Sequence, residues 1–125
     1  LMNPQDALKE KVWAVIGATA RKEKFGYKIY ARLRDRGYTV YPVNPNVAEI
    51  DGARCYPSLS ELPEVPAVVD FVVPETVGLA AVDECEQLGI KTVWLQPGAD
   101  KPSVVAKANE KGLNVIENCV LVQLP

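Results

Sequence analysis

The stretch that decides the fold is Val12–Ile16 (VWAVI), followed at once by Gly17-Ala18-Thr19. Five consecutive apolar residues are typical of a strand that is buried on both faces of a parallel sheet. A glycine directly after such a strand permits a tight turn. Apolar residues at helical spacing then predict a helix over 25–36, and Gly37 supplies its C-terminal stop.

The rest of the chain repeats this alternation of strand and helix. Further strands are predicted at 39–43, 68–73, 92–96 and 114–116, with Pro42 at a position that needs no donor. Helices are predicted near Pro4, over 76–88 with Val77, Ala81, Cys85 and Leu88 inward, and from an N-cap at Asp100 to Gly112. The region 44–57 is expected to be a loop with a turn at Asp51-Gly52, and 58–62 to form one helical turn.

Strands that alternate with helices imply right-handed crossovers and a parallel sheet. The expected fold class is therefore α/β, a Rossmann-like doubly wound sheet of about five mainly parallel strands with helices on both faces. The 125 residues suit a single domain, residues 1–125.

Composition excludes several functions. Fourteen basic and 16 acidic residues give a net charge of −2, which argues against nucleic-acid binding. No apolar run reaches the roughly 20 residues of a membrane span, and no secretory signal is evident. Three cysteines without Cys-x-x-Cys spacing indicate reduced thiols and a cytoplasmic location. No histidine is present, which excludes histidine-based triads, phosphohistidine intermediates and histidine metal sites.

The candidate site lies where the predicted strands end. In open parallel sheets, ligands bind beyond the carboxyl ends of the strands. The residues there are small, polar or constrain the backbone: Gly17-Ala18-Thr19, Asn44-Pro45, Pro74-Glu75-Thr76, Pro97-Gly98 and Glu117-Asn118-Cys119. We expect a ligand-binding site and neither a catalytic pair nor a metal site.

The first loop predicts a phosphate site. Its backbone N–H groups and the following helix N-terminus favour an anion, and Arg21, Lys22 and Lys24 add positive charge. The alternative is a plain turn in which Gly17 serves only close packing.

A nicotinamide cofactor on the same loop, with hydride transfer or redox sensing, is the rival hypothesis. It is disfavoured because Gly-x-Gly-x-x-Gly is absent and no acid follows the second strand. Asn44 occupies that place, and Pro45 restricts it to an extended conformation.

Several strings together resemble the small stand-alone CoA-binding proteins, a family similar to the CoA-binding domain of the succinyl-CoA synthetase α subunit. They are Gly17-Ala18-Thr19, Lys24-Phe25-Gly26-Tyr27, Tyr41-Pro42-Val43-Asn44-Pro45, Tyr56-Pro57-Ser58-Leu59, Val93-Trp94-Leu95-Gln96 and Gly98. The resemblance covers about 12–122. This chain departs from the family at Glu75, where a second proline is common, and at Asn118, where arginine is common.

The resemblance implies coenzyme A or an acyl-CoA as cofactor and a single extended site. The loop 17–19 and Lys24 would hold phosphates, Val43, Asn44 and Pro45 the adenosine, and Val73-Pro74 the pantetheine. Asn118 and Cys119 would close the site. The site residues expected in full are Gly17, Ala18, Thr19, Arg21, Lys24, Phe25, Gly26, Val43, Asn44, Pro45, Val73, Pro74, Thr76, Gln96, Gly98, Asn118 and Cys119.

Without histidine or an acid–base pair, the chain is predicted to hold the ligand as a carrier, sensor or regulatory module rather than to turn it over. An interaction protein with a vestigial site is a third hypothesis. Cys119 is interpreted as a small buried hydrophobe in preference to a partner for the CoA thiol, and Cys85 as core. No stretch has the pattern of an interface, so a homodimer stays an open alternative.

Overall fold

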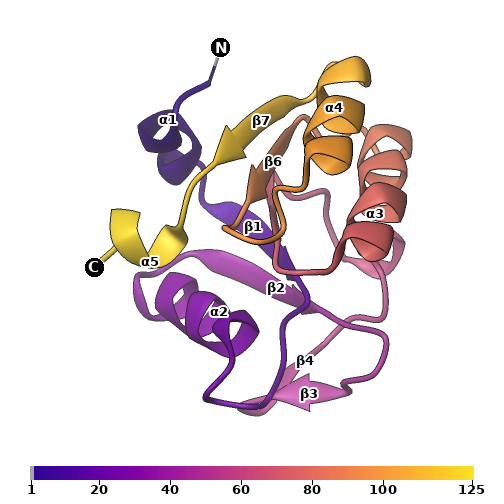
Figure 1. Ribbon diagram of the computed structural model, residues 1–125. Helices are drawn as coiled ribbons and strands as arrows, with labels where there is room; N and C mark the ends of the chain where they lie inside the picture. The colour runs from indigo at the N-terminus through magenta and orange to yellow at the C-terminus, as the bar shows by residue number, and fades with distance from the viewer. Residues whose placement is uncertain (1) are drawn as a thin grey trace.

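The computed structural model describes residues 2–125. Five parallel strands form one sheet in the order β2-β1-β5-β6-β7, with α3 and α4 on one face and α1, α2 and α5 on the other (Figure 1). The strands are β1 (Val12–Ile16), β2 (Thr39–Val43), β5 (Val68–Phe71), β6 (Thr92–Leu95) and β7 (Asn114–Glu117). The helices are α1 (Pro4–Lys9), α2 (Phe25–Asp35), α3 (Glu75–Gln87), α4 (Pro102–Glu110) and α5 (Val120–Gln123). The predicted α/β class is confirmed.

The strand order reverses between β1 and β5. After β2 the chain returns past β1 and continues with β5, β6 and β7 on its other side. The loops that follow β1 and β5 therefore lead away from each other, to opposite sides of the sheet. This position is the topological switch point, where doubly wound folds bind their ligands.

Two apolar layers hold the helices to the sheet. On one face, Val69 and Phe71 of β5 pack with residues of α3 and α4; on the other, Trp13 and Trp94 pack with α1, α2 and α5. Both tryptophans are fully buried and their ring centroids lie 5.5 Å apart, so both belong to the core. Cys85 is also fully buried, as predicted.

Two predicted elements begin or end elsewhere. β5 stops at Phe71 and not at Val73, because its neighbour β1 turns away at Gly17 and leaves only a bond from Val72 N–H to Ile16 O (3.0 Å). The N-cap of α4 is Lys101 and not Asp100, because Pro102 is suited to the first helical position. Asp100 instead accepts a hydrogen bond from Gly98 N–H at 3.1 Å.

The predicted inward face of α3 is confirmed at Ala81 and Cys85 and is wrong at Val77. Val77 is 49% exposed, and the buried positions are Gly78, Ala81, Val82 and Cys85. The glycine explains this difference, since a Cβ on Gly78 would lie 3.3 Å from the side chain of Val104. The two helices approach each other closely at that point.

The predicted loop 44–57 contains a small hairpin, β3 (Glu49–Ile50) and β4 (Ala53–Arg54). The predicted turn at Asp51-Gly52 connects them, with positive φ values of 50° and 81°. These values are those of the tight hairpin turns that favour Asp-Gly. Strands of two residues are too short to show an alternation of apolar and polar residues, so the sequence pattern predicted only the turn between them. The helical turn predicted at 58–62 is present as a 3₁₀ turn, η1 (Leu59–Glu61).

Pro42 lies in an edge strand, as its missing donor requires. Its carbonyl points outward and accepts from Tyr56 N–H at 2.9 Å, while Val43 O, facing β1, accepts from Gly17 N–H at 3.0 Å. The proline nitrogen thus points away from the sheet, where no ladder bond is needed.

Asp70, on the central strand β5, is fully buried among apolar residues. Neither oxygen of its carboxyl has a hydrogen-bond partner in the described part of the chain. Burial, and to a smaller extent the nearby Cys119, raise the pKa of Asp70 well above its ordinary value. The acid is therefore held in its neutral form inside the fold.

Asp70→Asn should remove a pH dependence of the free energy of unfolding. In the unfolded chain the acid ionises near pH 3.9, whereas in the folded chain it stays protonated to higher pH. The stability due to Asp70 is complete below the unfolded pKa and is lost as pH rises through the folded pKa. Urea unfolding between about pH 4 and pH 8 should show the wild type losing stability relative to the variant. If the difference in free energy of unfolding between the two proteins did not change with pH, the assignment of Asp70 as a buried neutral acid would be contradicted.

Candidate functional site

Gly17 sits where β1, β5 and α2 come closest together. Its φ is +87°, and a Cβ at this position would lie 2.0 Å from Val72 O. Gly26, in the first turn of α2, closes the other side, since its Cβ would lie 2.1 Å from Gly17 O. Only glycine fits at either position, so these two residues set how tightly the loop 17–24 folds against the helix.

The loop 17–24 leads into an uncapped helix. Lys24 is the N-cap of α2, and no side chain among residues 2–125 bonds there. The first N–H groups of the helix therefore point toward the loop, where they favour an anion. Thr19 Oγ1 accepts from Arg21 N–H at 3.2 Å and shapes the same turn.

The basic side chains of this loop are exposed. Arg21 is paired with Glu23 at 3.0 Å, and Lys24 lies beside the helix start. Phe25, the next residue, is 64% exposed. The loop thus places cations next to the helix N-terminus, as the sequence predicted.

Asn44 joins the first two loops of the site. Its Nδ2 donates to Ala18 O at 2.9 Å, and its Oδ1 accepts from Asn46 N–H at 2.9 Å. Both polar atoms of the side chain are thus engaged within the protein. Asn44 therefore holds the loop after β2 against the loop after β1, and it presents no carboxylate to a ribose.

A groove of about 780 Å³ opens between the ends of β1, β2 and β5 on one side and α3 on the other. A second cavity of about 300 Å³ lies over the ends of β5 and β6. Val72, Val73 and Pro74 line both, so the two are neighbours. The volume of the larger one lies in the range of small-molecule sites.

Of the predicted site residues, a first group lines these cavities: Gly17, Val43, Asn44, Pro45, Val73, Pro74, Gln96 and Gly98. A second group lies around them without lining them: Ala18, Thr19, Arg21, Lys24, Phe25, Gly26, Thr76, Asn118 and Cys119. Ala18 and Gly26 are buried and support the loop, and Gln96 Oε1 accepts from Val120 N–H at 3.0 Å.

Sequence reasoning missed the α3 wall of the groove. Val77, Ala80, Asp83, Glu84 and Gln87 line it, together with Pro57 and Ser58 from the segment before η1. The helical spacing of 77, 80, 84 and 87 could have revealed a second face, but Val77 had been placed in the core. Asp83 is paired with Lys107 at 2.5 Å, which offsets part of the negative charge of this wall.

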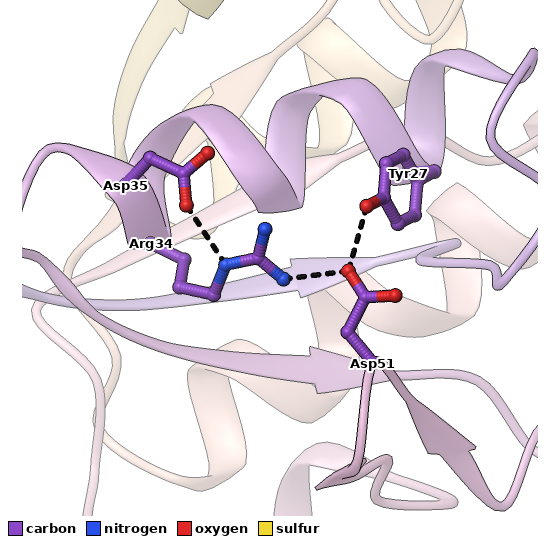
Figure 2. A network of polar contacts seen from close by, with 4 residues as sticks. All are labelled: Tyr27, Arg34, Asp35 and Asp51. Atoms are coloured by element: carbon purple, nitrogen blue, oxygen red, sulfur yellow. Dashed lines mark hydrogen bonds and ion pairs between the residues drawn. The ribbon is translucent and has the colours of Figure 1, made fainter.

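The hairpin β3–β4 is attached to α2 by a network of polar contacts (Figure 2). Tyr27 Oη donates to Asp51 Oδ2 at 2.6 Å, and Arg34 donates to the same oxygen at 2.8 Å. The Tyr27 hydroxyl, followed by Arg34, lowers the pKa of Asp51. Because Tyr27 lies in the first turn of α2, the network also fixes the position of the helix start.

The fold and the groove define a Rossmann-like ligand-binding domain with its site at the switch point. A family model described as CoA binding domain matches residues 11–125. The chain therefore belongs to the CoA-binding domain family, which confirms the resemblance seen in the sequence. Membership of this family supports CoA as the kind of ligand that the chain binds.

Among curated relatives, the chain is 30% identical to the α subunit of an ADP-forming acetate–CoA ligase II from Pyrococcus furiosus, over 86% of this chain and 26% of that one. It is 45% identical to an ADP-forming acetate–CoA ligase I from Archaeoglobus fulgidus, over 60% of this chain and 11% of the relative. The chain thus spans about a quarter or less of the ligase chains that it matches.

A solved structure of a hypothetical protein from Pyrococcus horikoshii matches over nearly the whole length. Its TM-score is 0.88 at 32% identity, covering 95% of this chain and 84% of that one. The uncharacterized protein YneT of Bacillus subtilis is 28% identical over 98% of this chain and 96% of its own. No helix within residues 2–125 has the length and apolar character needed to cross a membrane.

Asn44→Asp should destabilise the fold by about 1–3 kcal/mol. The change replaces a donor by a carboxylate oxygen that faces Ala18 O, so the two loops lose their connection. Urea unfolding measures the cost. Asn46→Asp is the matched control, because Asn46 joins this contact through its backbone N–H and should change stability little. Equal effects of the two substitutions would contradict the role given to Asn44.

Tyr27→Phe should raise the pKa of Asp51 toward its ordinary value, because the hydroxyl contributes most to lowering it. The stabilisation due to ionised Asp51 is present above its unfolded pKa and is lost as pH falls through the folded pKa. In the variant that loss should therefore begin at higher pH. NMR titration of the Asp51 carboxyl measures the shift. Tyr38→Phe, whose hydroxyl donates to Leu8 O, should leave the titration unchanged.

Proposed function

We propose that the chain binds coenzyme A, or an acyl-CoA, across the two neighbouring cavities and acts as a carrier, sensor or regulatory module without turnover of its own. The observation that carries the proposal is a groove that begins at Gly17, the first residue of the loop that leads to the uncapped start of α2, together with a neighbouring cavity over β6. CoA has matching parts: an anionic nucleotide at one end and a long, weakly polar arm at the other.

The phosphates would occupy the loop 17–24. Backbone N–H groups at the start of α2 and the charges of Arg21 and Lys24 would neutralise them. This end of the groove is thus electrostatically distinct from the wall that carries Asp83 and Glu84. The adenosine would lie along Val43, Asn44 and Pro45.

The pantetheine arm would cross from the larger cavity into the smaller one over Val72, Val73 and Pro74, which line both. An apolar floor with backbone polar groups suits a chain that contains two amides. Gln96 and Gly98 line the far cavity, and Asn118 and Cys119 follow the neighbouring strand β7.

The rival, a nicotinamide dinucleotide on the same loop, has less support from the geometry. Asn44 stands where an acid would bind the ribose hydroxyls, and both of its polar atoms are engaged in the loop contacts.

The names of the ligase relatives state a reaction in which CoA is joined to acetate. This chain has no histidine to carry a phosphoryl group. We therefore propose that it shares ligand binding with those proteins and not their ligation chemistry.

Thermal and urea unfolding in the presence of CoA test the proposal. Bound CoA should stabilise the chain by about 2.7 kcal/mol at a concentration 100 times Kd, whereas NAD at the same concentration should have little effect. No stabilisation at millimolar CoA would overturn the proposal.

Lys24→Ala should weaken CoA binding about tenfold, since it removes one charge-assisted contact to phosphate. Isothermal titration calorimetry at two salt concentrations measures both the affinity and its salt dependence, which should decrease in the variant. Lys91→Ala is the matched control, because this exposed lysine precedes β6 and so lies at the amino ends of the strands, away from the candidate site. An equal loss of CoA affinity in both variants would show that the effect comes from the net charge of the chain, and it would contradict a phosphate contact at Lys24.

A further inference from the structure

Gln96 has the one polar side chain among the residues that line the smaller cavity. It directly follows β6 and is only 4% exposed. The other residues that line this cavity are Val72, Val73, Pro74, Pro97, Gly98 and Ala99. A primary amide in such surroundings has little contact with bulk water, so each of its polar atoms needs a hydrogen-bond partner.

The orientation of the Gln96 amide is fixed by the start of α5. Its Oε1 accepts from Val120 N–H at 3.0 Å. Because a backbone N–H needs an acceptor, the amide oxygen and not the amide nitrogen must face Val120. Nε2 is therefore the atom that carries the remaining donors of this side chain.

These donors have no partner within the protein. Among residues 2–125, Gln96 Nε2 makes no hydrogen bond, and only the two carboxyl oxygens of Asp70 are both fully enclosed and without a partner. Nε2 thus keeps access to space outside the protein, and the cavity that Gln96 lines supplies that space. The fold leaves a nearly buried donor free at this end of the candidate site.

The backbone offers the smaller cavity few further donors. Gly98 N–H is bonded to Asp100 Oδ1 at 3.1 Å, and Ala99 N–H to Gln96 O at 2.9 Å. Val73 N–H makes no backbone hydrogen bond within residues 2–125, but Val73 lines both cavities, whereas Gln96 lines only the smaller one. Nε2 is therefore the donor at the far end of the site.

We propose that Gln96 Nε2 donates a hydrogen bond to the thioester carbonyl of a bound acyl-CoA, so that the site prefers an uncharged acyl thioester to free CoA. The inference rests on the proposed function, in which the pantetheine arm brings the sulfur end of the ligand into the smaller cavity. A carbonyl oxygen is a good acceptor, whereas the sulfur of a free thiol is a weak one. The acyl-CoA thus satisfies a donor that CoA leaves unpaired.

The lining of the cavity indicates which acyl groups fit. No charged side chain lines it, and the nearest acid along the chain is Asp100, which is bonded to Gly98 N–H. An acyl group that ends in a carboxylate would lose water against apolar side chains without gaining a cationic partner. An uncharged acyl group instead buries apolar surface against Val72, Pro97 and Ala99.

Isothermal titration calorimetry of the whole chain with acetyl-CoA, S-ethyl-CoA and CoA tests the carbonyl contact. S-ethyl-CoA is a thioether that has a methylene group in place of the thioester carbonyl and is otherwise the same size. Acetyl-CoA should bind about fivefold more tightly than the thioether, the effect of one neutral hydrogen bond, and more tightly than CoA. Acetyl-CoA that binds no more tightly than either of the other two would overturn the proposal.

Gln96→Met assigns the preference to the side chain. Methionine has a similar length but no amide, so the preference for acetyl-CoA over S-ethyl-CoA should vanish. Loss of the bond to Val120 N–H would weaken both ligands equally and leave their ratio unchanged, so a retained preference would overturn the role of Gln96. Gln5→Met, at an exposed position of α1, is the matched control and should keep the ratio. If Gln96→Met does not fold, the wild-type ratio decides alone.

Butyryl-CoA and succinyl-CoA test the uncharged acyl group, because both acyl chains have four carbons and only succinyl ends in a carboxylate. Succinyl-CoA should bind about tenfold more weakly or worse, since its carboxylate finds no cation in the cavity. Succinyl-CoA that binds as tightly as butyryl-CoA would overturn this part of the proposal.

The same titrations separate this inference from the proposed function. Equal binding of CoA, acetyl-CoA and S-ethyl-CoA would support CoA as the ligand and overturn the contact of Gln96 with the thioester. If Gln96→Met also weakened all three equally, the amide would act on the pantetheine arm or on α5, and the inference would again be overturned. No binding of any of the three at millimolar concentration would overturn both.

Discussion

The close packing at Gly17 is the constraint on which the rest of the site depends. With φ at +87° and space for no Cβ against Val72 O, this residue lets β1 end beside β5 and turn immediately toward α2. Gly26 completes the contact from the helix. A larger residue at either position would push α2 away from the sheet edge. The helix start, the loop between and the mouth of the groove would then lose their common position.

The sequence was sufficient for the architecture because each strand is a short apolar run followed by a turn residue. All five sheet strands and the three longer helices were predicted close to their observed bounds. What failed depends on tertiary contacts. The exposure of Val77 follows from the approach of Gly78 to Val104, and the end of β5 follows from the turn of its neighbour. The part of the candidate site formed by the residues after the strands could be predicted from the sequence. Its α3 wall could not, because one face of this helix packs in the core and another lines the groove, so the helix has no single apolar stripe.

Several acids in this part of the fold are bound to neighbouring groups or buried. Asp51 is bound to Tyr27 and Arg34, Asp83 to Lys107, and Glu75 accepts from Ser103. Asp70 is kept neutral by burial. Glu84, on the groove wall, forms no ion pair among residues 2–125, and the overall charge of −2 does not reveal this difference between the acids.

The outer edge of β2 also affects how the molecule behaves at high concentration. An open edge strand presents unpaired N–H and C=O groups to which another chain can add. Here Pro42 offers no N–H, and Tyr56 binds both Pro42 O and Asn44 N–H, each at 2.9 Å. The proline that interrupts the strand pattern, together with the segment after the hairpin, therefore protects this edge against edge-to-edge aggregation.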